Sequence, residues 1–146
     1  MAALTLDRFI PYRLSVASNA VSSRISQSYR KRFGLKIAEW RLIAILAEAK
    51  RMTPQALGQT TRMDKISVSR AAAALMERGL VQTSTNPEDG RSHFLSLTAD
   101  GQSLYAEIAP AALAMEADLL SDFTPEESEF LETQLRRIEK AASDFP

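Results

Sequence analysis

Residues 64–79 of the chain read DKISVSRAAAALMERG, and this stretch predicts a helix of roughly Lys65 to Arg78. Asp64 is a favourable N-cap, and Gly79 is a residue type at which helices commonly end. A projection at about 100° per residue separates an apolar face from a mixed face. The apolar face comprises Val68, Ala71, Ala72, Leu75 and Met76, and the opposite face comprises Ile66, Arg70, Ala73 and Glu77, with Ser67 and Ser69 on its flanks.

Residues 80–101 continue as LVQTSTNPEDGRSHFLSLTADG and change from a helical to a strand pattern. Leu80 to Thr85 and His93 to Leu97 are both typical of strands, and residues 86–90 between them are turn formers. These features predict a β-hairpin directly after the helix.

The residues before Asp64 predict a second short helix and the helix that precedes it. Thr53 followed by Pro54 is typical of an N-cap with proline at the first helical position, so a short helix is expected from Pro54 to Thr60. Ile37 to Ala49 has apolar residues at helical spacing. Two short helices joined by a few residues form a helix-turn-helix candidate, and the hairpin behind it is then a wing. Residues 37–97 are therefore predicted to form a winged helix-turn-helix with its own small core.

The first segment, Leu4 to Phe33, predicts a long helix with one apolar stripe. Its apolar residues recur mostly at steps of three or four, and Gly34 provides the stop. The basic triplet before Gly34 is explained by the helix dipole, and a direct role in DNA binding is the alternative. The stripe comprises Leu6, Phe9, Ile10, Leu14, Ala17, Val21, Ile25 and Tyr29, and the triplet comprises Arg30, Lys31 and Arg32.

The last segment predicts two more helices. Thr98 can cap a long helix through about Ser121, bent near Pro110. Thr124 with Glu127 forms a capping box for a final helix toward Ser143.

The arms, residues 1–33 and 99–146, have nothing nearby in the sequence to cover their apolar stripes, so a second copy of the chain is the natural partner. The predicted fold is mainly α with a small β-wing: one chain, residues 1–146, in which a winged helix-turn-helix domain is flanked by long N- and C-terminal dimerisation helices.

Composition excludes several classes of protein. The 146 residues are 45% hydrophobic and 25% charged, as in an ordinary soluble globular protein. No stretch approaches the roughly 18 uncharged apolar residues that a membrane span needs. Asp7 and Arg8 near the start, with no small-residue cleavage site, argue against a secretory signal, so we expect a cytoplasmic protein with no membrane partner.

The chain has few of the residue types that support catalysis or metal binding. The chain has no cysteine, and His93 is its single histidine, so thiolate metal sites, a cysteine nucleophile and a disulfide framework are excluded. An enzyme would depend on a carboxylate pair such as Glu126 and Glu127, which are better explained as charges at a helix N-terminus. We therefore expect no catalytic residues, no metal and no cofactor.

The formal net charge of zero hides a gradient along the chain. Residues 1–52 hold ten Lys or Arg and three acidic residues, residues 53–101 hold five of each, and residues 102–146 hold three basic and ten acidic residues. Such asymmetry indicates a nucleic-acid face or two arms of opposite charge that pack together.

The mixed face of the helix from Lys65 suits entry into the major groove. A groove about 12 Å wide requires small side chains for close approach and a long donor to reach a base edge. Arg70 suits guanine, and Ile66 or Ala73 suits a thymine methyl group. The alternative is an ordinary amphipathic surface helix, which the hairpin behind it disfavours.

Polar residues near the two short helices could hold the phosphate backbone. Ser67 and Ser69 suit bases or phosphates. Thr53 and Gln55 could contact phosphates through their side chains and backbone N–H groups, although simple capping explains them equally well.

Residues 89–101 carry a resemblance to a known family. Asp89-Gly90-Arg91, followed by the run from Leu95 through Leu97-Thr98 to Gly101, resembles the D-x-R and L-T-x-x-G wing signature of MarR-type transcriptional regulators. Residues 63–70 with 77–81 are similar to their recognition helix and its exit, and residues 39–42 with Leu46 are similar to the helix after their first arm. The resemblance covers nearly the whole chain and implies a winged helix-turn-helix homodimer that binds a pseudo-palindromic operator.

The resemblance implies a role for the wing. Arg91 lies at the tip and reaches into the minor groove, with Asp89 orienting its guanidinium, and a narrow A·T-rich groove attracts such an arginine. The alternative is that the two residues pair only to stiffen the turn. Some family members have a second arginine where this chain has Gly90, so this wing makes fewer backbone contacts. The DNA-binding candidates are Thr53, Gln55, Lys65, Ile66, Ser67, Ser69, Arg70, Ala73, Asp89 and Arg91.

The resemblance also implies a ligand-responsive repressor. In many relatives a small aromatic effector binds between the arms and the winged domain, and Tyr12, Tyr29 and Trp40 are candidates to line such a cavity; ordinary core packing is the favoured alternative. The lack of cysteine excludes induction by thiol oxidation. The competing interpretation of the whole chain is a winged-helix protein-interaction module without specific DNA binding.

Overall fold

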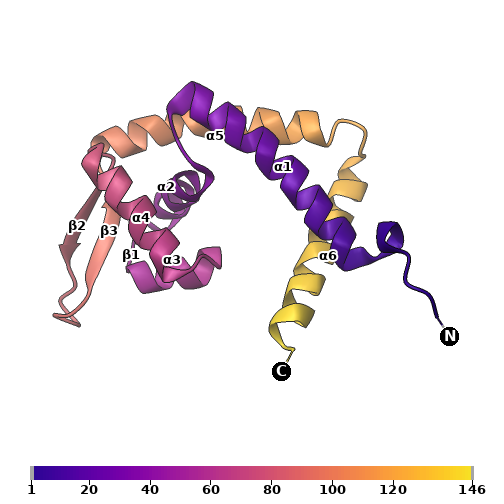
Figure 1. The fold of residues 1–146 in the computed structure, drawn as a ribbon. Helices are drawn as coiled ribbons and strands as arrows, with labels where there is room; N and C mark the ends of the chain where they lie inside the picture. The colour runs from indigo at the N-terminus through magenta and orange to yellow at the C-terminus, as the bar shows by residue number, and fades with distance from the viewer. Residues whose placement is uncertain (1, 146) are drawn as a thin grey trace. The chain divides into compact units, whose positions relative to one another are not determined.

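A computed structural model describes residues 2–145 and divides the chain into two compact units. The first unit ends at Ala106 and the second begins at Glu107. The order of elements is helix, helix, helix-turn-helix, hairpin and two further helices (Figure 1). The predicted fold class, mainly α with a small β-wing, is confirmed.

The first arm begins later than the sequence pattern indicates. A short 3-10 turn, η1 (Leu6–Arg8), precedes helix α1 (Ile10–Phe33). Pro11 lies in the first turn of α1, where its missing N–H costs nothing, whereas inside a helix that began at Leu4 it would break the hydrogen-bond ladder. The expected continuous helix from Leu4 is therefore wrong.

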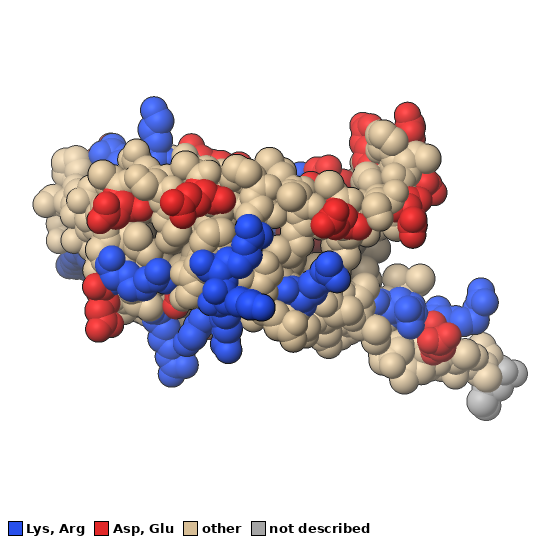
Figure 2. All heavy atoms as spheres, turned by 90° about the horizontal axis from the view of Figure 1, so that it is seen from above, with Lys and Arg blue, Asp and Glu red and all other residues tan. Residues whose placement is uncertain are grey.

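The apolar stripe of the first arm is buried only toward its C-terminal end. Tyr29 is 3% exposed, and Val21 and Ile25 are half-buried, but Ile10 is 60% exposed. The basic residues of the last turn are exposed, and Figure 2 shows Lys and Arg side chains gathered along the segment that carries α1.

The helix-turn-helix consists of α3 (Pro54–Thr61) and α4 (Lys65–Glu77), and α2 (Ile37–Ala49) packs against both. The core among them comprises Leu42, Ile43, Leu46, Leu57, Val68, Ala71, Ala72 and Leu75, all buried. Burial of each leucine contributes about 1.5–3 kcal/mol of transfer free energy. Met76, expected on the apolar face, is exposed in the last turn of α4.

A three-stranded antiparallel sheet forms the wing and its base. Its order is β1 (Arg51–Met52), β3 (His93–Leu97), β2 (Val81–Thr85), with Arg51 opposite Ser96 and Val81 opposite Leu97. The hairpin of β2 and β3 agrees with the sequence pattern, whereas β1 is an addition to it. A strand of two residues is too short to carry an alternating pattern, and it forms because β3 presents an open edge.

Helix α5 (Ala99–Leu119) starts directly on the exit of α4. The Thr98 hydroxyl donates to the carbonyl of Gly79 at 2.6 Å and accepts from the N–H of Gly101 at 3.0 Å. The backbone N–H of Thr98 donates to the carbonyl of Leu80 at 3.0 Å. One threonine thus begins α5 and fixes it to the residues that follow α4.

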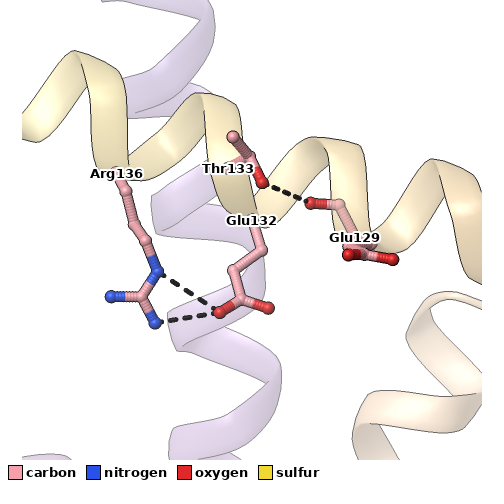
Figure 3. A network of polar contacts seen from close by, with 4 residues as sticks. All are labelled: Glu129, Glu132, Thr133 and Arg136. Atoms are coloured by element: carbon pink, nitrogen blue, oxygen red, sulfur yellow. Dashed lines mark hydrogen bonds and ion pairs between the residues drawn. The ribbon is translucent and has the colours of Figure 1, made fainter.

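The second unit consists of the rest of α5 and helix α6 (Pro125–Ser143). Thr124 and Glu127 form the predicted capping box. The surface of α6 carries local contacts: Arg136 pairs with Glu132 at 2.9 Å, and the Thr133 hydroxyl donates to the carbonyl of Glu129 at 3.1 Å (Figure 3). Over residues 2–145, no helix combines the length and apolar character needed to cross a membrane.

Candidate nucleic-acid interface

The N-terminal end of α4 is fixed by Asp64. Its carboxylate accepts from the backbone N–H of Ser67 at 2.8 Å and from the Ser67 hydroxyl at 2.9 Å. These two hydrogen bonds to the charged form lower the pKa of Asp64. The Ser67 hydroxyl therefore donates within the chain, and only its oxygen remains to accept from DNA.

The N-terminal end of α3 is capped by Thr53, whose hydroxyl oxygen accepts from the N–H of Ala56 at 3.1 Å. Thr53 therefore has a capping role in the structure.

The turn between α3 and α4 is tight. Arg62 follows α3 in the left-handed conformation with φ 60°. A Cβ at Gly58 would approach the carbonyl oxygen of Met63 to 3.3 Å, so the glycine lets the turn pass closely over α3.

The wing tip is held by side-chain contacts to its own backbone. The N–H of Arg91 donates to Asp89 Oδ1 at 3.0 Å, and the N–H of Glu88 donates to Asn86 Oδ1 at 3.0 Å. In place of the expected contact with the guanidinium of Arg91, Asp89 binds the backbone N–H of that residue. Asp89 stiffens the turn, and the Arg91 side chain is exposed.

A groove of about 820 Å³ lies among α3, the start of α4 and the wing. Five of the predicted DNA-binding residues line it, namely Gln55, Lys65, Ser69, Asp89 and Arg91. Its cations Lys65 and Arg91 come from opposite sides, α4 and the wing. The chain therefore brings together donors that are up to 36 residues apart in the sequence.

The remaining candidates on α4 lie outside this groove. Ile66, Arg70 and Ala73 are exposed, and their spacing of four and three residues puts them on one outer face of the helix. Ile66 is 64% exposed, which is high for an apolar side chain. In the described part of the chain, the guanidinium of Arg70 has no hydrogen-bond or ion-pair partner. This face offers a donor and two apolar contacts to a base edge.

Three polar residues in the groove, Gln59, Ser92 and His93, are absent from the predicted candidates. Gln59 lies one turn after Gln55 on α3, a helical spacing that the sequence already contains. His93, expected as a surface or cross-strand residue, pairs with Thr85 across the hairpin and also lines the groove. Its position depends on how the hairpin packs against α3 and α4, which no local pattern encodes.

The predicted effector residues do not all come together. Tyr29 and Trp40 are neighbours, with ring centroids 5.2 Å apart, and Trp40 stacks on Tyr105 at 6.3 Å. Burial raises the pKa of Tyr29. Tyr12 is exposed near the start of α1 and makes none of these ring contacts. The cluster has the tilted and stacked geometry of aromatic core packing.

Metal-ligating side chains are not clustered in the part of the chain that the structure covers. Among residues 2–145, no group of three or more His, Asp or Glu side chains could hold an ion. The chemistry of the site is that of hydrogen-bond donors and cations arranged around a groove.

Comparisons with known proteins agree with this arrangement. Residues 33–92 match the model of the MarR family. The chain is 25% identical over 124 residues to an uncharacterized HTH-type transcriptional regulator, YwoH, of Bacillus subtilis strain 168, covering 85% of this chain and 89% of that protein.

Solved structures share the fold over almost the full length. A MarR/EmrR family transcriptional regulator from Acinetobacter sp. ADP1 superposes with a TM-score of 0.89 and 27% identity, covering 97% of this chain and all of that one. A MarR family transcriptional regulator from Streptomyces coelicolor, solved in complex with DNA, gives a TM-score of 0.86 at 22% identity, covering 97% and 91% of the two chains.

The family comparison also resolves the class of protein. Members of this family are transcriptional regulators and not enzymes, so the expectation that the chain is not an enzyme is confirmed. The wing signature, the winged helix-turn-helix and these relatives lead to one assignment. Residues 33–92 of the chain match the MarR family, and over most of its length the chain is similar to HTH-type and MarR family transcriptional regulators.

Proposed function

We propose that the chain acts in the cytoplasm as a homodimeric repressor that binds a pseudo-palindromic operator and releases it when a small aromatic effector binds. The observation that carries this proposal is the groove in which Gln55, Lys65 and Arg91 converge beside the exposed outer face of α4. In this arrangement α4 enters the major groove and the wing reaches the adjacent minor groove. A dimer places two such units about one helical turn of DNA apart.

The groove and the outer face of α4 make different kinds of contact with DNA. Lys65, Gln55 and the backbone near Thr53 contact phosphates and set the register. Arg70, with Ile66 and Ala73, reads base edges. Ser69 contacts bases or phosphates, and Ser67, whose hydroxyl donates to Asp64, accepts from a donor on a base edge. Arg91, with its turn held by Asp89, contacts the minor groove.

Exposed apolar side chains on the arms support the homodimer. In the second unit, Phe130 is 67% and Leu113 is 66% exposed. Leu131, Leu135 and Ile138 recur at steps of four and three on α6, which makes one continuous apolar stripe. Large exposed apolar patches mark interaction sites, and a second copy brings the basic first arm near an acidic last arm.

The test of operator binding is a selection of genomic DNA fragments by the purified protein, followed by fluorescence anisotropy on the selected and scrambled duplexes at several salt concentrations. We expect the selected duplex to contain an inverted repeat and its affinity to fall steeply with salt, because cations on the protein displace counterions. No enrichment, or weak and equal binding to both duplexes, contradicts the proposal and favours the protein-interaction module.

Arg91→Ala tests the minor-groove contact. We expect a loss of about 1 kcal/mol in operator affinity, roughly fivefold, that is largest when the base pairs under the wing are A·T-rich, because a narrow minor groove has the more negative potential. Anisotropy on operators with A·T or G·C flanks measures this difference. Arg24→Ala, which removes the same charge from the exposed surface of α1, is the control. Equal losses on both flanks would show that Arg91 contacts phosphates only.

A double variant of α6, Leu135→Asp with Ile138→Asp, tests the dimer interface. Both side chains are exposed in the single chain, so the change leaves the fold of the protomer intact. We expect the dimer dissociation constant to rise at least about tenfold, because two carboxylates would be buried without partners. Sedimentation velocity over a concentration series measures it. Arg136→Ala, on the exposed Glu132 pair, should leave the dimer unchanged, and an unchanged mass for the double variant would refute the interface.

A further inference from the structure

The C-terminal end of the recognition helix α4 is bound to the C-terminal end of α1 by one side chain. Arg78, the C-cap of α4, donates from Nη1 to the carbonyl of Gly34 at 3.1 Å and from Nη2 to the carbonyl of Phe33 at 3.2 Å. These partners lie 44 and 45 residues away in the sequence. A planar guanidinium presents two N–H donors to adjacent acceptors in a fixed fork, a geometry that the ammonium group of lysine lacks.

These two carbonyls are not used by the cap at the end of α1. Gly34 adopts φ 65°, and its N–H donates to the carbonyl of Arg30 while that of Leu35 donates to the carbonyl of Tyr29. The carbonyls of Phe33 and Gly34 lie beyond this cap and receive the guanidinium. Helix ends require such external partners for their last acceptors.

Charge compensation alone does not explain the contact. The last turn of α1 has cations of its own in Arg30, Lys31 and Arg32, and all three are exposed. Local cations suffice to balance the negative end of a helix dipole. The specific feature of Arg78 is that it joins two helices, the first arm and the recognition helix.

Residues 78–80, which follow the last residue of α4, are also joined to the start of α5. The carbonyls of Gly79 and Leu80 accept from the side chain and backbone of Thr98. Residues 78–80 are therefore connected to the end of one arm and the beginning of the other. The opposite end of α4 lines the groove at Lys65, so the contacts of residues 78–80 orient the helix from its C-terminal end.

We propose that Arg78 is a positioning residue that sets the angle of α4 relative to α1 and, in the homodimer, the separation of the two recognition helices. The inference rests on the proposed homodimeric operator binding. The guanidinium of Arg78 is held by the carbonyls of Gly34 and Phe33, so Arg78 acts on DNA affinity through the orientation of α4 and not by contact. Through this side chain a change at the end of α1 is transmitted to α4.

The experiment uses the absence of cysteine in the chain. A single Glu77→Cys substitution at the exposed end of α4 gives one unique site for a nitroxide spin label per protomer. Pulsed electron–electron double resonance then measures the distance distribution between the two recognition helices of a dimer. We expect one narrow distribution in the parent and a broader or shifted distribution with Arg78→Gln. Arg78→Lys restores the distribution in part, because an ammonium group reaches one of the two carbonyls.

Unlabelled variants are then compared on operators with one or two base pairs inserted or removed between the half-sites. Arg78→Gln should lose about fivefold to tenfold on the native spacing and little on the altered ones, so its spacing preference flattens. Arg30→Gln removes the same charge from the end of α1 without removing the hydrogen bonds, and it should behave as the parent. A merely stabilising role would lower affinity on all spacings equally.

Each failure has a distinct signature. An unchanged distance distribution and an unchanged spacing preference in Arg78→Gln overturn the positioning role. If the labelled parent protein gives no measurable distance between two protomers, the homodimer is overturned instead. In that case a label pair at Arg24→Cys and Glu77→Cys within one protomer tests the angle between α1 and α4, and an identical distribution with and without Arg78→Gln overturns the inference.

Discussion

Gly101→Ala is expected to lower the free energy of unfolding by about 3 kcal/mol, at the upper end of the effect of overpacking. Gly101 is buried in the first turn of α5, where a Cβ would collide with the carbonyl group of Leu80 and crowd the Cβ of Leu97. The carbonyl cannot move away freely, because it accepts from the N–H of Thr98. Helix propensity alone predicts the opposite sign, a gain of about 1 kcal/mol for alanine over glycine. We expect the steric cost of the added Cβ to exceed the gain in helix propensity.

Urea unfolding followed by circular dichroism, at one fixed protein concentration, measures this change. Gly90→Ala is the matched control, because a Cβ at this wing-tip residue would have no atom within 4 Å. It should change stability by less than about 0.5 kcal/mol. A Gly101→Ala protein as stable as the parent would show that α5 does not start this close to the exit of α4.

The elements themselves are largely predictable because their signals are local. Asp64 and Gly79 mark the ends of α4, and Thr124 with Glu127 marks the start of α6, through caps that involve residues three or four apart. Apolar spacing alone extends the first arm too far, because it does not register the break that Pro11 imposes. Strand β1 escapes prediction because only pairing with the distant β3 stabilises it.

The site is predictable where one helix face decides it and less so where separate segments meet. Arg70 and Ile66 follow from the helical projection of α4. The inclusion of His93 and Gln59 in the groove depends on the placement of the hairpin against α3, and the contact of Arg78 with Phe33 spans 45 residues. Such positions are set by packing, which a local pattern does not encode.

Arg70→Ala is expected to weaken operator binding by about 1–3 kcal/mol and to relax discrimination at one base pair in each half-site. Arg70 is exposed on the outer face of α4 between Ile66 and Ala73, whose shorter side chains allow the helix to approach the bases closely. An arginine in this place donates two hydrogen bonds to guanine O6 and N7, which no other base edge accepts in the same geometry. Anisotropy on the operator and on its single-base variants measures the effect.

Two further variants separate base recognition from charge. Lys65→Ala should weaken specific and random DNA by a similar factor and reduce the salt slope by about one, as expected of a phosphate contact. Arg70→Lys keeps the charge but loses the two-pronged donor, so it should bind random DNA as the parent does and still fail to discriminate the critical base pair. If Arg70→Ala lowers the affinity for operator and random DNA equally, Arg70 holds the backbone and the base-reading role passes to other residues on the outer face of α4.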